Sequence, residues 1–364
     1  MFYTLNMDKG NESGLRINKL WIKNYKAIDE LEIEFPKPEL EGDSDVFVLG
    51  SQNGVGKTSV LECCGLVFLA LNWGEKIINH FFPLLYISRV RTGAAQAEIS
   101  AYLGKSGHEF KVTVTISAEL KDGYFTYVIT AADEDKLKDF SSSRQARLKS
   151  KTLVDDFKND LNSLLGQSQN PLLLPGYLYF HSYRKVPEGG ISLNQIINSE
   201  KSDQEESVLE ASTFKKDVIR LLISKSGLVD NINEEEVSSH LDKLNDLVKE
   251  FACGRIEKLK NAPDNAYHLL FTEINSGLRY IFDHLSSGQK EMISTLFLIS
   301  RATSTAPGII LIDEPELHLN AGWHRSIVNC LHKINLHNQY ILATHSDIVF
   351  DSVDAKHRIL LENG

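Results

Sequence analysis

The alternation of apolar and polar residues predicts strands at the start of the chain. Between residues 15 and 35 apolar side chains tend to recur at every second position, and this period of two predicts two strands joined at residues 24–28. Residues 46–49 are continuously apolar, as expected for a strand covered on both faces. The apolar run at residues 60–71 predicts a helix directly after it.

A second group of strands is predicted further along the first half of the chain. Turn signals occur at residues 104–107 and 121–123, and they separate segments of strand character. This arrangement predicts an antiparallel meander. The strand-like segments are residues 97–103, 109–118 and 124–131.

The middle of the chain is charged and predicts helices. Residues 134–165 and 199–259 have this character, and residues 178–180 return to strand character between them. Neither charged stretch sustains apolar heptads long enough for an extended coiled coil.

Helices and strands alternate towards the end of the chain. The expected elements are a helix at residues 289–301, a strand at 308–312, a helix at 321–334, and strands at 340–343 and 358–361. Strands that alternate with helices are typical of a parallel sheet flanked by helices. The predicted fold class is therefore α/β, with a mixed or antiparallel first lobe, a mostly parallel core sheet and a helical insertion.

Composition places the chain among ordinary globular proteins. Its 364 residues allow one large domain, or one domain with a substantial insertion. The longest apolar stretch, residues 66–71, is far too short to cross a bilayer. Residues 1–12 lack the basic-then-apolar order of a secretion signal, so a cytoplasmic protein with no membrane partner is expected.

Charge leaves the question of nucleic acid open. A net charge of −10 argues against a protein whose whole surface binds polyanions. Local basic clusters occur at Arg89 with Arg91, at residues 144–151, and at Arg184 with Lys185. A solvated helix face is the preferred interpretation of residues 144–151, so DNA binding is allowed but not required.

The cysteines and the late histidines show no paired metal-ligand spacing. The cysteines, which are expected to be buried and reduced, are Cys63, Cys64, Cys253 and Cys330. The histidines, which are read as ordinary helix residues, are His318, His324, His332 and His337.

The segment GSQNGVGKTS at residues 50–59 joins a predicted strand to a predicted helix. The backbone N–H groups of such a glycine-rich turn form an anion-binding nest. Lys57 can reach the β- and γ-phosphates of a nucleotide, and the hydroxyl of Thr58 can ligate Mg²⁺. The strict pattern is missed by one position, because Ser51 stands where the first glycine belongs and Gly50 lies one residue early. The expected nucleotide-binding residues are Ser51, Asn53, Gly54, Val55, Gly56, Lys57, Thr58 and Ser59.

Two carboxylates follow the predicted strand at residues 308–312. Their position is the carboxyl end of a buried strand, which is where α/β sheets bind ligands. Asp313 is expected to hold Mg²⁺ opposite Thr58, and Glu314 to polarise the attacking water in phosphoryl transfer. The alternative is an acidic strand end in a turn before Pro315, and the phosphate-binding loop makes that alternative the weaker one.

His345 follows the predicted strand at residues 340–343. A histidine at a strand end is more often structural than functional. Here the strand should end at the same sheet edge as Asp313, where a side chain can contact a γ-phosphate. We therefore expect His345 to sense that phosphate.

The segment LSSGQKE at residues 285–291 precedes a predicted helix. Serine hydroxyls and backbone N–H groups at the positive end of a helix attract phosphate. Since the chain already has a phosphate-binding loop, we expect this segment to contact the ATP bound by a second copy of the chain. By itself, this segment would be a common helix cap. The residues expected to act in trans are Ser286, Ser287, Gly288 and Gln289.

Together these four motifs resemble those of the ATP-binding-cassette ATPases, and more narrowly the branch that contains the SMC, RecF and OLD families and the AAA family ATPases of the AAA_15 and AAA_21 type. Asn53 stands where transporter cassettes usually carry serine. Residues 22–28 (IKNYKAI) are similar to the first strand turn of RecF- and OLD-like heads. Residues 313–319 (DEPELHL) resemble their Walker B and D-loop run, although Asn320 stands where many relatives have proline.

The resemblance implies three parts in the chain. Residues 1–185 form the first lobe of the head with the Walker A loop, residues 186–265 a helical insertion, and residues 266–364 the second lobe with the signature, Walker B and histidine switch. The specific motifs cover residues 15–130 and 270–364.

The resemblance also implies partners. OLD proteins continue into a Toprim nuclease domain after the histidine switch, whereas this sequence ends at Gly364. If the likeness extends to the stand-alone ATPases of bacterial anti-phage systems such as Septu and PARIS, a nuclease or toxin comes from a separate chain. Family analogy alone does not establish that step.

The glutamine that links the two lobes in this family has no secure position. Gln96 is a candidate, because it follows the first predicted strands. Arg184 is an alternative lobe-joining residue. A structural role in the core is the stronger interpretation of both.

The expected function is that of an ATP-hydrolysing head that binds ATP and Mg²⁺ and forms a head-to-head homodimer on Mg-ATP. The preferred role is regulation of a separate effector, such as a nuclease, in bacterial defence. One alternative is a RecF- or SMC-like ATPase of DNA repair, which would show steeply salt-dependent DNA binding. Another is the ATPase subunit of a transporter, which Asn53 and the insertion argue against.

Overall fold

The structure is a computed structural model, and it divides into two compact units. The described residues are 15–38, 43, 45–50, 55–73, 89–105, 108–117, 125–131, 163–164, 169, 171–174, 176–192, 195–196, 212–226, 233–262 and 266–361. The first unit comprises Met1–Gln167, Pro171–Ser182 and Ala302–Gly364, and the second comprises Ser168–Asn170 and Tyr183–Arg301. The three-part division at residues 185 and 265 stays a prediction.

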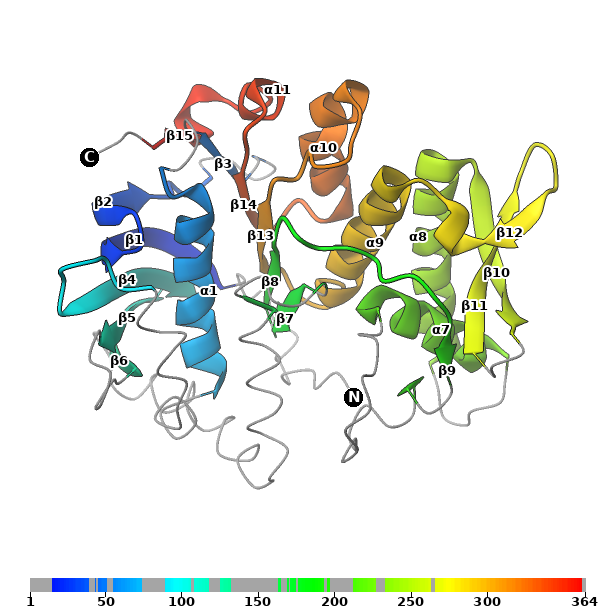
Figure 1. The fold of residues 1–364 in the computed structure, drawn as a ribbon, viewed down its shortest axis with the longest axis horizontal. Coiled ribbons are helices and arrows are strands. Elements are labelled where there is room, and N and C mark those ends of the chain that lie inside the picture. Colours follow the sequence, from blue (N-terminus) through cyan, green and yellow to red (C-terminus); the bar gives the residue numbers. More distant parts are fainter. Residues whose placement is uncertain are drawn as a thin grey trace. The chain divides into compact units, whose positions relative to one another are not determined.

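An antiparallel sheet begins the first unit (Figure 1). In spatial order its strands are β2 (Ile28–Glu34), β1 (Arg16–Tyr25), β4 (Gln96–Lys105), β5 (His108–Ser117) and β6 (Phe125–Ala131). Every neighbouring pair is antiparallel. The predicted hairpin and the predicted meander are therefore both confirmed, and they join into one sheet through the pairing of β1 with β4.

The core sheet of the first unit has six strands, and five of them are parallel. In spatial order they are β15 (Arg358–Leu360), β3 (Val46–Gly50), β14 (Gln339–Ala343), β13 (Ile309–Asp313), β8 (Tyr177–Phe180) and the antiparallel β7 (Leu172–Leu174). The three central strands β3, β14 and β13 are buried along their whole length. Burial on both faces explains why their sequences are continuous apolar runs. The predicted α/β class, with an antiparallel first lobe and a mostly parallel core sheet, is confirmed.

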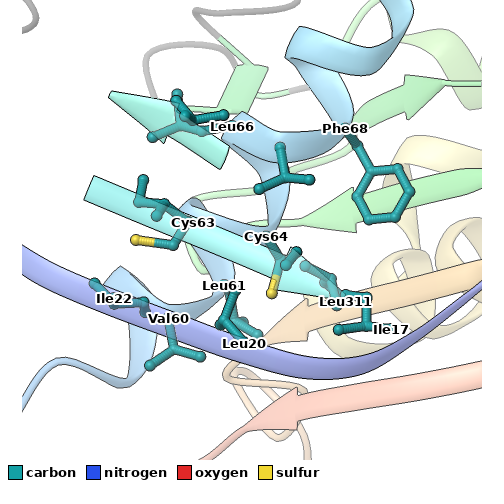
Figure 2. Packing of buried hydrophobic residues seen from close by; sticks show 14 of the residues in the cluster. Ile17, Leu20, Ile22, Val60, Leu61, Cys63, Cys64, Leu66, Phe68 and Leu311 are labelled. Atoms are coloured by element: carbon teal, nitrogen blue, oxygen red, sulfur yellow. The ribbon is translucent and has the colours of Figure 1, made fainter. Parts of the chain in front are cut away.

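Helix α1 (Lys57–Trp73) contacts strands of both sheets. Its side chains are buried all around the helix between residues 59 and 71. Figure 2 shows Val60, Leu61 and Cys64 of this helix packed among side chains of the two sheets, such as Leu20 and Leu311. A helix with apolar residues on every face is stable only when it is covered on every side, and the two sheets supply that cover.

The two sheets are also joined by hydrogen bonds of a buried glutamine. The side-chain oxygen of Gln339 accepts from the N–H of Ile17 at 2.8 Å, and its amide donates to the carbonyl of Ile17 at 2.9 Å. The bulge between Ile17 and Lys19 interrupts the register of β1 with β4 at this point. Gln339 therefore satisfies backbone groups beside an irregular stretch of strand.

In the described residues after 320, the first unit has further helical elements. They are α10 (Ala321–Ile334), α11 (Asp347–Phe350) and the 3₁₀ turn η2 (Ala355–His357). The predicted helix at residues 321–334 is confirmed. Asn320, which stands where many relatives have proline, is the N-cap of α10, and its side chain accepts from the N–H of Trp323 at 3.1 Å.

The second unit combines helices with a small antiparallel sheet. Among the described residues its elements include β9 (Ile191–Ser192), α7 (Thr213–Lys225), α8 (Glu234–Ala252), β10 (Gly254–Asn261), β11 (Ala266–Glu273), β12 (Arg279–Ile281), the 3₁₀ turn η1 (Phe282–His284) and α9 (Ser287–Ala302). Strand β11 lies between β10 and β12 and also pairs with β9. Phe214 of α7 contacts Phe282 and Phe297, which ties α7 to η1 and α9.

The prediction of helix as far as residue 259 was wrong. Helix α8 ends at Ala252, and Cys253 adopts a left-handed conformation with φ 53° that stops it. Gly254 then begins strand β10. A Cβ at this position would lie 2.0 Å from Cζ of Phe271 on the paired strand, which explains why the residue is a glycine. Only glycine allows β10 to approach β11 here.

Cysteine burial agrees with the sequence except at one position. Cys63, Cys64 and Cys330 are buried, but Cys253 is exposed. The expectation that it is buried was wrong, since it is the C-cap at the end of α8. Burial raises the pKa of Cys64 to about 12 and that of Cys63 well above its usual value, which makes both thiols unreactive. Among the described residues, every helix is too short or too polar for a membrane span.

Candidate nucleotide-binding site

Three parallel strands of the first unit bring the predicted chemistry to one edge of the core sheet. Strands β3, β14 and β13 lie next to one another and run in the same direction (Figure 1). The segments that leave their carboxyl ends are the glycine-rich loop, the residues after Ala343, and Asp313 with Glu314. Ligands of α/β sheets bind at this edge, and the motifs therefore meet where the fold expects a ligand.

The glycine-rich loop is described only in part. Three of its predicted residues, Ser51, Asn53 and Gly54, lie outside the described residues. Gly56 has φ +103°, a conformation that side chains rarely adopt, and its carbonyl accepts from the N–H of Val60 as α1 begins. The loop therefore turns directly into the helix, as anion-binding loops of this type do.

Gly50 has a packing role at the end of β3. A Cβ at this position would lie 2.5 Å from two ring atoms of Phe350 in α11. Gly50 therefore makes room for an aromatic ring at the end of β3. This contact gives a structural reason for a glycine one residue before the position that the strict phosphate-loop pattern requires.

Lys57 is the first residue of α1 and is almost fully buried. Its Nζ lies 3.3 Å from Nδ1 of His345. Burial lowers the pKa of Lys57, and the nearby carboxylates of Asp313, Glu314 and Glu316 act in the opposite direction. The ammonium group is thus held beside three acidic side chains, at the place where a phosphate group would supply further negative charge.

Thr58 and Asp313 meet directly at the sheet edge. The hydroxyl of Thr58 donates to Oδ2 of Asp313 at 3.0 Å, although the two residues are 255 positions apart in the sequence. Asp313 is 2% exposed. A hydroxyl and a carboxylate in contact are the hard oxygen ligands that Mg²⁺ prefers, and so the residues fit that ion.

Glu314 and His345 face each other across the same edge. His345 Nε2 lies 3.8 Å from Oε1 of Glu314, and both side chains are partly exposed. The backbone of Glu314 has φ 48°, which is uncommon outside glycine, and its N–H donates to the carbonyl of Ala343 at 2.8 Å. An unusual backbone conformation at a cluster of ionisable side chains is typical of functional sites.

Two residues of this site were missed in the sequence. Glu316 accepts from the backbone N–H of His345 at 2.8 Å. His324, which was read as an ordinary helix residue, lies 3.2 Å from Oγ of Ser346 through Nδ1 and 3.2 Å from the carbonyl of Leu319 through Nε2. A second carboxylate two positions after Glu314 was the available signal for Glu316, but spacing alone could not identify the partners of His324.

The predicted signature residues begin α9 in the second unit. Ser286 and Gln289 form a reciprocal cap: the N–H of Gln289 donates to Oγ of Ser286 at 3.3 Å, and the N–H of Ser286 donates to Oε1 of Gln289 at 3.0 Å. The amide of Gln289 also donates to the carbonyl of Phe251 at 3.1 Å. Ser286 and Ser287 are exposed, whereas Gly288 is buried. The helix-cap interpretation therefore holds here, and a role in trans stays a prediction.

The two candidates for the lobe-joining residue also stay predictions. Gln96 is exposed at the start of β4, and its backbone carbonyl accepts from the side chain of Asn24 at 3.3 Å. Arg184 is buried in the second unit. Neither observation assigns a contact with nucleotide.

A parallel sheet whose ligand edge carries a glycine-rich loop, a buried lysine, and a threonine in contact with an aspartate defines the class of P-loop nucleotide-binding proteins. The chain belongs to the AAA_21 family, described as "AAA domain, putative AbiEii toxin, Type IV TA system", whose family model matches residues 52–351. The resemblance to AAA family ATPases seen in the sequence is thereby confirmed.

The chain is also similar to named proteins and to a solved structure. The chain is 24% identical to the "Retron Ec83 probable ATPase" of Escherichia coli, in an alignment that covers 96% of this chain and 72% of that protein. It is 29% identical to the "Septu protein PtuA" of Bacillus mycoides over 26% of this chain and 14% of that protein. Among solved structures, the fold is similar to an Smc head bound to the C-terminal winged-helix domain of ScpA, with 14% identity, a TM-score of 0.49, and coverage of 93% of this chain and 92% of that chain.

Proposed function

We propose that the protein hydrolyses ATP at the ligand edge of its core sheet. The observation that carries this proposal is the contact of Thr58 with Asp313, beside a buried Lys57. The AAA_21 family and the similarity to a protein named "Retron Ec83 probable ATPase" support it. The nucleotide-binding part of the proposal rests on the P-loop class, and the hydrolytic part on the arrangement of Glu314 and His345.

Each side chain has a role that its geometry supports. Lys57 and the N–H groups of the glycine-rich loop bind the phosphates. Thr58 and Asp313 would hold Mg²⁺, which neutralises charge on the phosphates when bound. Glu314, partly exposed at the edge, orients the attacking water and takes its proton. His345 lies 3.3 Å from Lys57, and therefore next to the group that contacts the γ-phosphate.

The test of hydrolysis compares variants at two of these positions. We expect Lys57→Ala to lose nucleotide binding. We expect Glu314→Gln to keep binding and to release phosphate about 10²–10⁴ times more slowly, the usual contribution of a general base. Lys23→Ala is the control, because Lys23 is exposed on β1. If Lys57→Ala retains its affinity for ATP, Lys57 does not bind the phosphates. If Glu314→Gln hydrolyses ATP at an unchanged rate, Glu314 is not the general base.

We also propose that two copies close head to head on Mg-ATP, with residues 286–289 of each copy acting on the ATP of the other. The exposure of Ser286 and Ser287 at the start of α9 supports this, since a helix N-terminus attracts phosphate. Glu314→Gln should form a dimer by light scattering when ATP is added. A mass that stays monomeric, with ATP bound, would contradict the dimer but leave hydrolysis intact.

Mixing two inactive variants tests the trans arrangement more sharply. Lys57→Ala removes the lysine that binds the phosphates within one copy. Ser287→Glu places a negative charge where the phosphate of the other copy should approach. A mixed dimer still contains one site with both halves intact, so hydrolysis should return on mixing. If the mixture is as inactive as its components, residues 286–289 do not complete the site of a second copy.

The proposed biological role is regulation of a separate effector, such as a nuclease, in bacterial defence against phage. This proposal is supported by the similarity to proteins named for the Ec83 retron and for Septu. Copurification followed by mass spectrometry, with Glu314→Gln used to hold the ATP-bound form, is the test. Recovery of a DNA-repair complex in place of a nuclease or toxin would favour the alternative role.

A surface of the second unit favours action on DNA as the second candidate function. In strand β11, Leu269 and Phe271 are buried, whereas Leu270 and Thr272, which follow them in turn, are partly exposed. Because side chains alternate along a strand, Leu270 and Thr272 belong to the outer face of the sheet. The residues that pair with them on β10 and β12 belong to the same face.

That outer face is basic. Lys258 pairs with Leu270, and Arg255 and Arg279 pair with Thr272 from either side. Lys260 continues the row along β10, and all four cations are exposed. Glu257, which pairs with Arg255 at 3.4 Å, is the one acidic side chain on β10. Charged residues also protect edge strands from aggregation, so the face supports DNA binding without requiring it.

Salt dependence separates these explanations. If the face binds the DNA backbone, Lys258→Gln with Lys260→Gln should weaken binding and lower the slope of log K against log salt by about 0.9 for each lost phosphate contact. Lys243→Gln is the control, because Lys243 is exposed on α8. If the wild type, the double variant and Lys243→Gln bind DNA with equal affinity, Lys258 and Lys260 protect the edge strand from aggregation and do not bind DNA.

A further inference from the structure

We infer that Glu316 and His324 are positioning residues that hold the loop carrying His345 in its working geometry, and this inference rests on the proposed ATP hydrolysis. Neither side chain need touch the nucleotide. Each acts through the three residues Thr344, His345 and Ser346, which connect β14 to α11.

Glu316 holds the loop at the backbone of His345. Its Oε1 accepts from the N–H of His345 at 2.8 Å, a charge-assisted bond that is stronger than one between neutral groups. The other carboxylate oxygen, Oε2, is buried and has no hydrogen-bond partner among the described residues. The single strong bond of this carboxylate is therefore directed at the residue that faces both Lys57 and Glu314.

The segment that carries Glu316 is itself held by local turns. The N–H of Leu317 donates to the carbonyl of Glu314 at 3.1 Å, and the N–H of Leu319 donates to that of Glu316 at 3.0 Å. Glu314 and His318 both have positive φ, at 48° and 63°. Two consecutive turns with unusual backbone angles hold the backbone of Glu316, and its side chain therefore extends from a fixed point towards His345.

His324 holds the same loop from the first turn of α10. Because the carbonyl of Leu319 can only accept, Nε2 of His324 must carry the proton of that 3.2 Å bond. In the neutral imidazole Nδ1 then accepts from the hydroxyl of Ser346 at 3.2 Å. Ser346 in turn caps α11 by accepting from the N–H of Val349. The tautomer of His324 thus follows from its partners.

These contacts hold the backbone on both sides of the His345 ring. Glu316 fixes its backbone N–H, and His324 fixes the next residue, Ser346, whose N–H also donates to Oγ1 of Thr344 at 2.9 Å. The result is that the His345 ring can lie 3.3 Å from Lys57 and 3.8 Å from Glu314 at once. Such placement raises the rate of the chemical step rather than the affinity for ATP, because the phosphates are bound by the loop and Lys57.

Substitutions at Glu316 separate positioning from charge. In Glu316→Gln an amide oxygen can still accept from the N–H of His345, whereas Glu316→Ala removes the acceptor. We expect Glu316→Ala to lower kcat at least tenfold with KM for ATP within about twofold, and Glu316→Gln to recover most of the rate. If Glu316 acted by its charge, for instance on a metal ion, Gln would be as inactive as Ala.

Substitutions at His324 test its hydrogen bonds with Leu319 and Ser346. His324→Gln can donate towards Leu319, and His324→Asn can accept from Ser346. We expect both to retain more activity than His324→Leu, which does neither. The matched control is Arg325→Ala, because Arg325 is exposed on the same helix. Thermal unfolding of each variant identifies any loss that comes from misfolding.

Amide hydrogen exchange tests the inference independently of catalysis. In Glu316→Ala the amide of His345 loses its acceptor, so a peptide covering residues 344–350 should exchange faster than in the wild type and in Glu316→Gln. Unchanged exchange in that peptide would overturn the positioning role. So would a kcat of Glu316→Ala equal to that of the wild type, provided that the wild type hydrolyses ATP. If the wild type has no ATPase activity but Glu316→Ala still exchanges faster, the contact of Glu316 with His345 is supported and the proposed function is refuted instead.

Discussion

Lys215 and Asp283 form a buried ion pair in the second unit, and removing one of the two partners should destabilise that unit strongly. Lys215 Nζ lies 2.5 Å from Oδ1 of Asp283, and the two side chains are 5% and 9% exposed. The ammonium group also donates to the carbonyls of Pro187 at 2.7 Å and Gly189 at 3.0 Å. The N–H of Gly189 donates to the other carboxylate oxygen at 2.9 Å. The ammonium group therefore has two carbonyl acceptors besides the carboxylate, whereas Oδ1 of Asp283 has the ion-pair contact with Lys215 and no hydrogen bond among the described residues.

Replacing Lys215 by Met would leave the carboxylate of Asp283 buried without its ion-pair partner. Breaking a buried pair in this way costs about 3–5 kcal/mol, whereas an exposed pair contributes about 0–1 kcal/mol. Burial lowers the pKa of Lys215 and Asp283 opposes that effect, which agrees with a desolvated but paired ammonium. We expect a loss of free energy of unfolding near the buried value, and a smaller loss in Lys215→Met with Asp283→Asn, where no isolated charge remains.

The assay must report on the second unit alone. All three tryptophans, Trp21, Trp73 and Trp323, lie in the first unit, so tryptophan fluorescence does not follow the unit that changes. Native-state hydrogen exchange of peptides from α7 and β11 measures the opening free energy of the second unit directly.

Lys225→Met is the control, because Lys225 is exposed at the end of the same helix. If Lys215→Met lowers the opening free energy by less than about 1 kcal/mol, the value for exposed pairs, the argument from burial fails. Equal losses in the single and double variants would show that the isolated carboxylate is not the cause.

Three further predictions concern single positions. Gly254→Ala should destabilise the protein by about 1–3 kcal/mol in thermal unfolding, because the new methyl carbon would meet Phe271 at 2.0 Å; an unchanged Tm would contradict the close approach. Gly56→Ala should cost about 1–2 kcal/mol and weaken ATP binding, since its φ of +103° strains any side chain; full affinity would refute this. In the native protein a thiol reagent should modify exposed Cys253 quickly and buried Cys64, whose pKa is raised to about 12, only on unfolding; equal rates would contradict that burial.

Local patterns were sufficient for most elements of the first unit. Alternation with a period of two predicted β1 and β2, and continuous apolar runs predicted β3 and β13, because burial on one face or on both imposes these patterns directly. The second unit was predicted less well. Strand β10 was read as helix, since its charged residues belong to an exposed sheet face and a short strand next to a helix carries little periodic signal.

The candidate site was predictable where a short motif carries its own chemistry. Lys57, Thr58 and Asp313 were identified in this way, and the contact between the last two agrees with the motif. His324 was dismissed, because its role depends on Ser346 and Leu319, and no spacing along the chain indicates that these three residues meet.

The sequence by itself determined the fold class and the kind of ligand, because hydrophobic periodicity and the glycine-rich loop are local properties of the chain. Only the tertiary structure decided which side chains share the sheet edge and how His345 is held there. Thr58 and Asp313 are 255 residues apart, and Lys57 and His345 are 288 apart. Parallel strands bring such distant residues together, since their carboxyl ends meet at one edge whatever the length of chain between them.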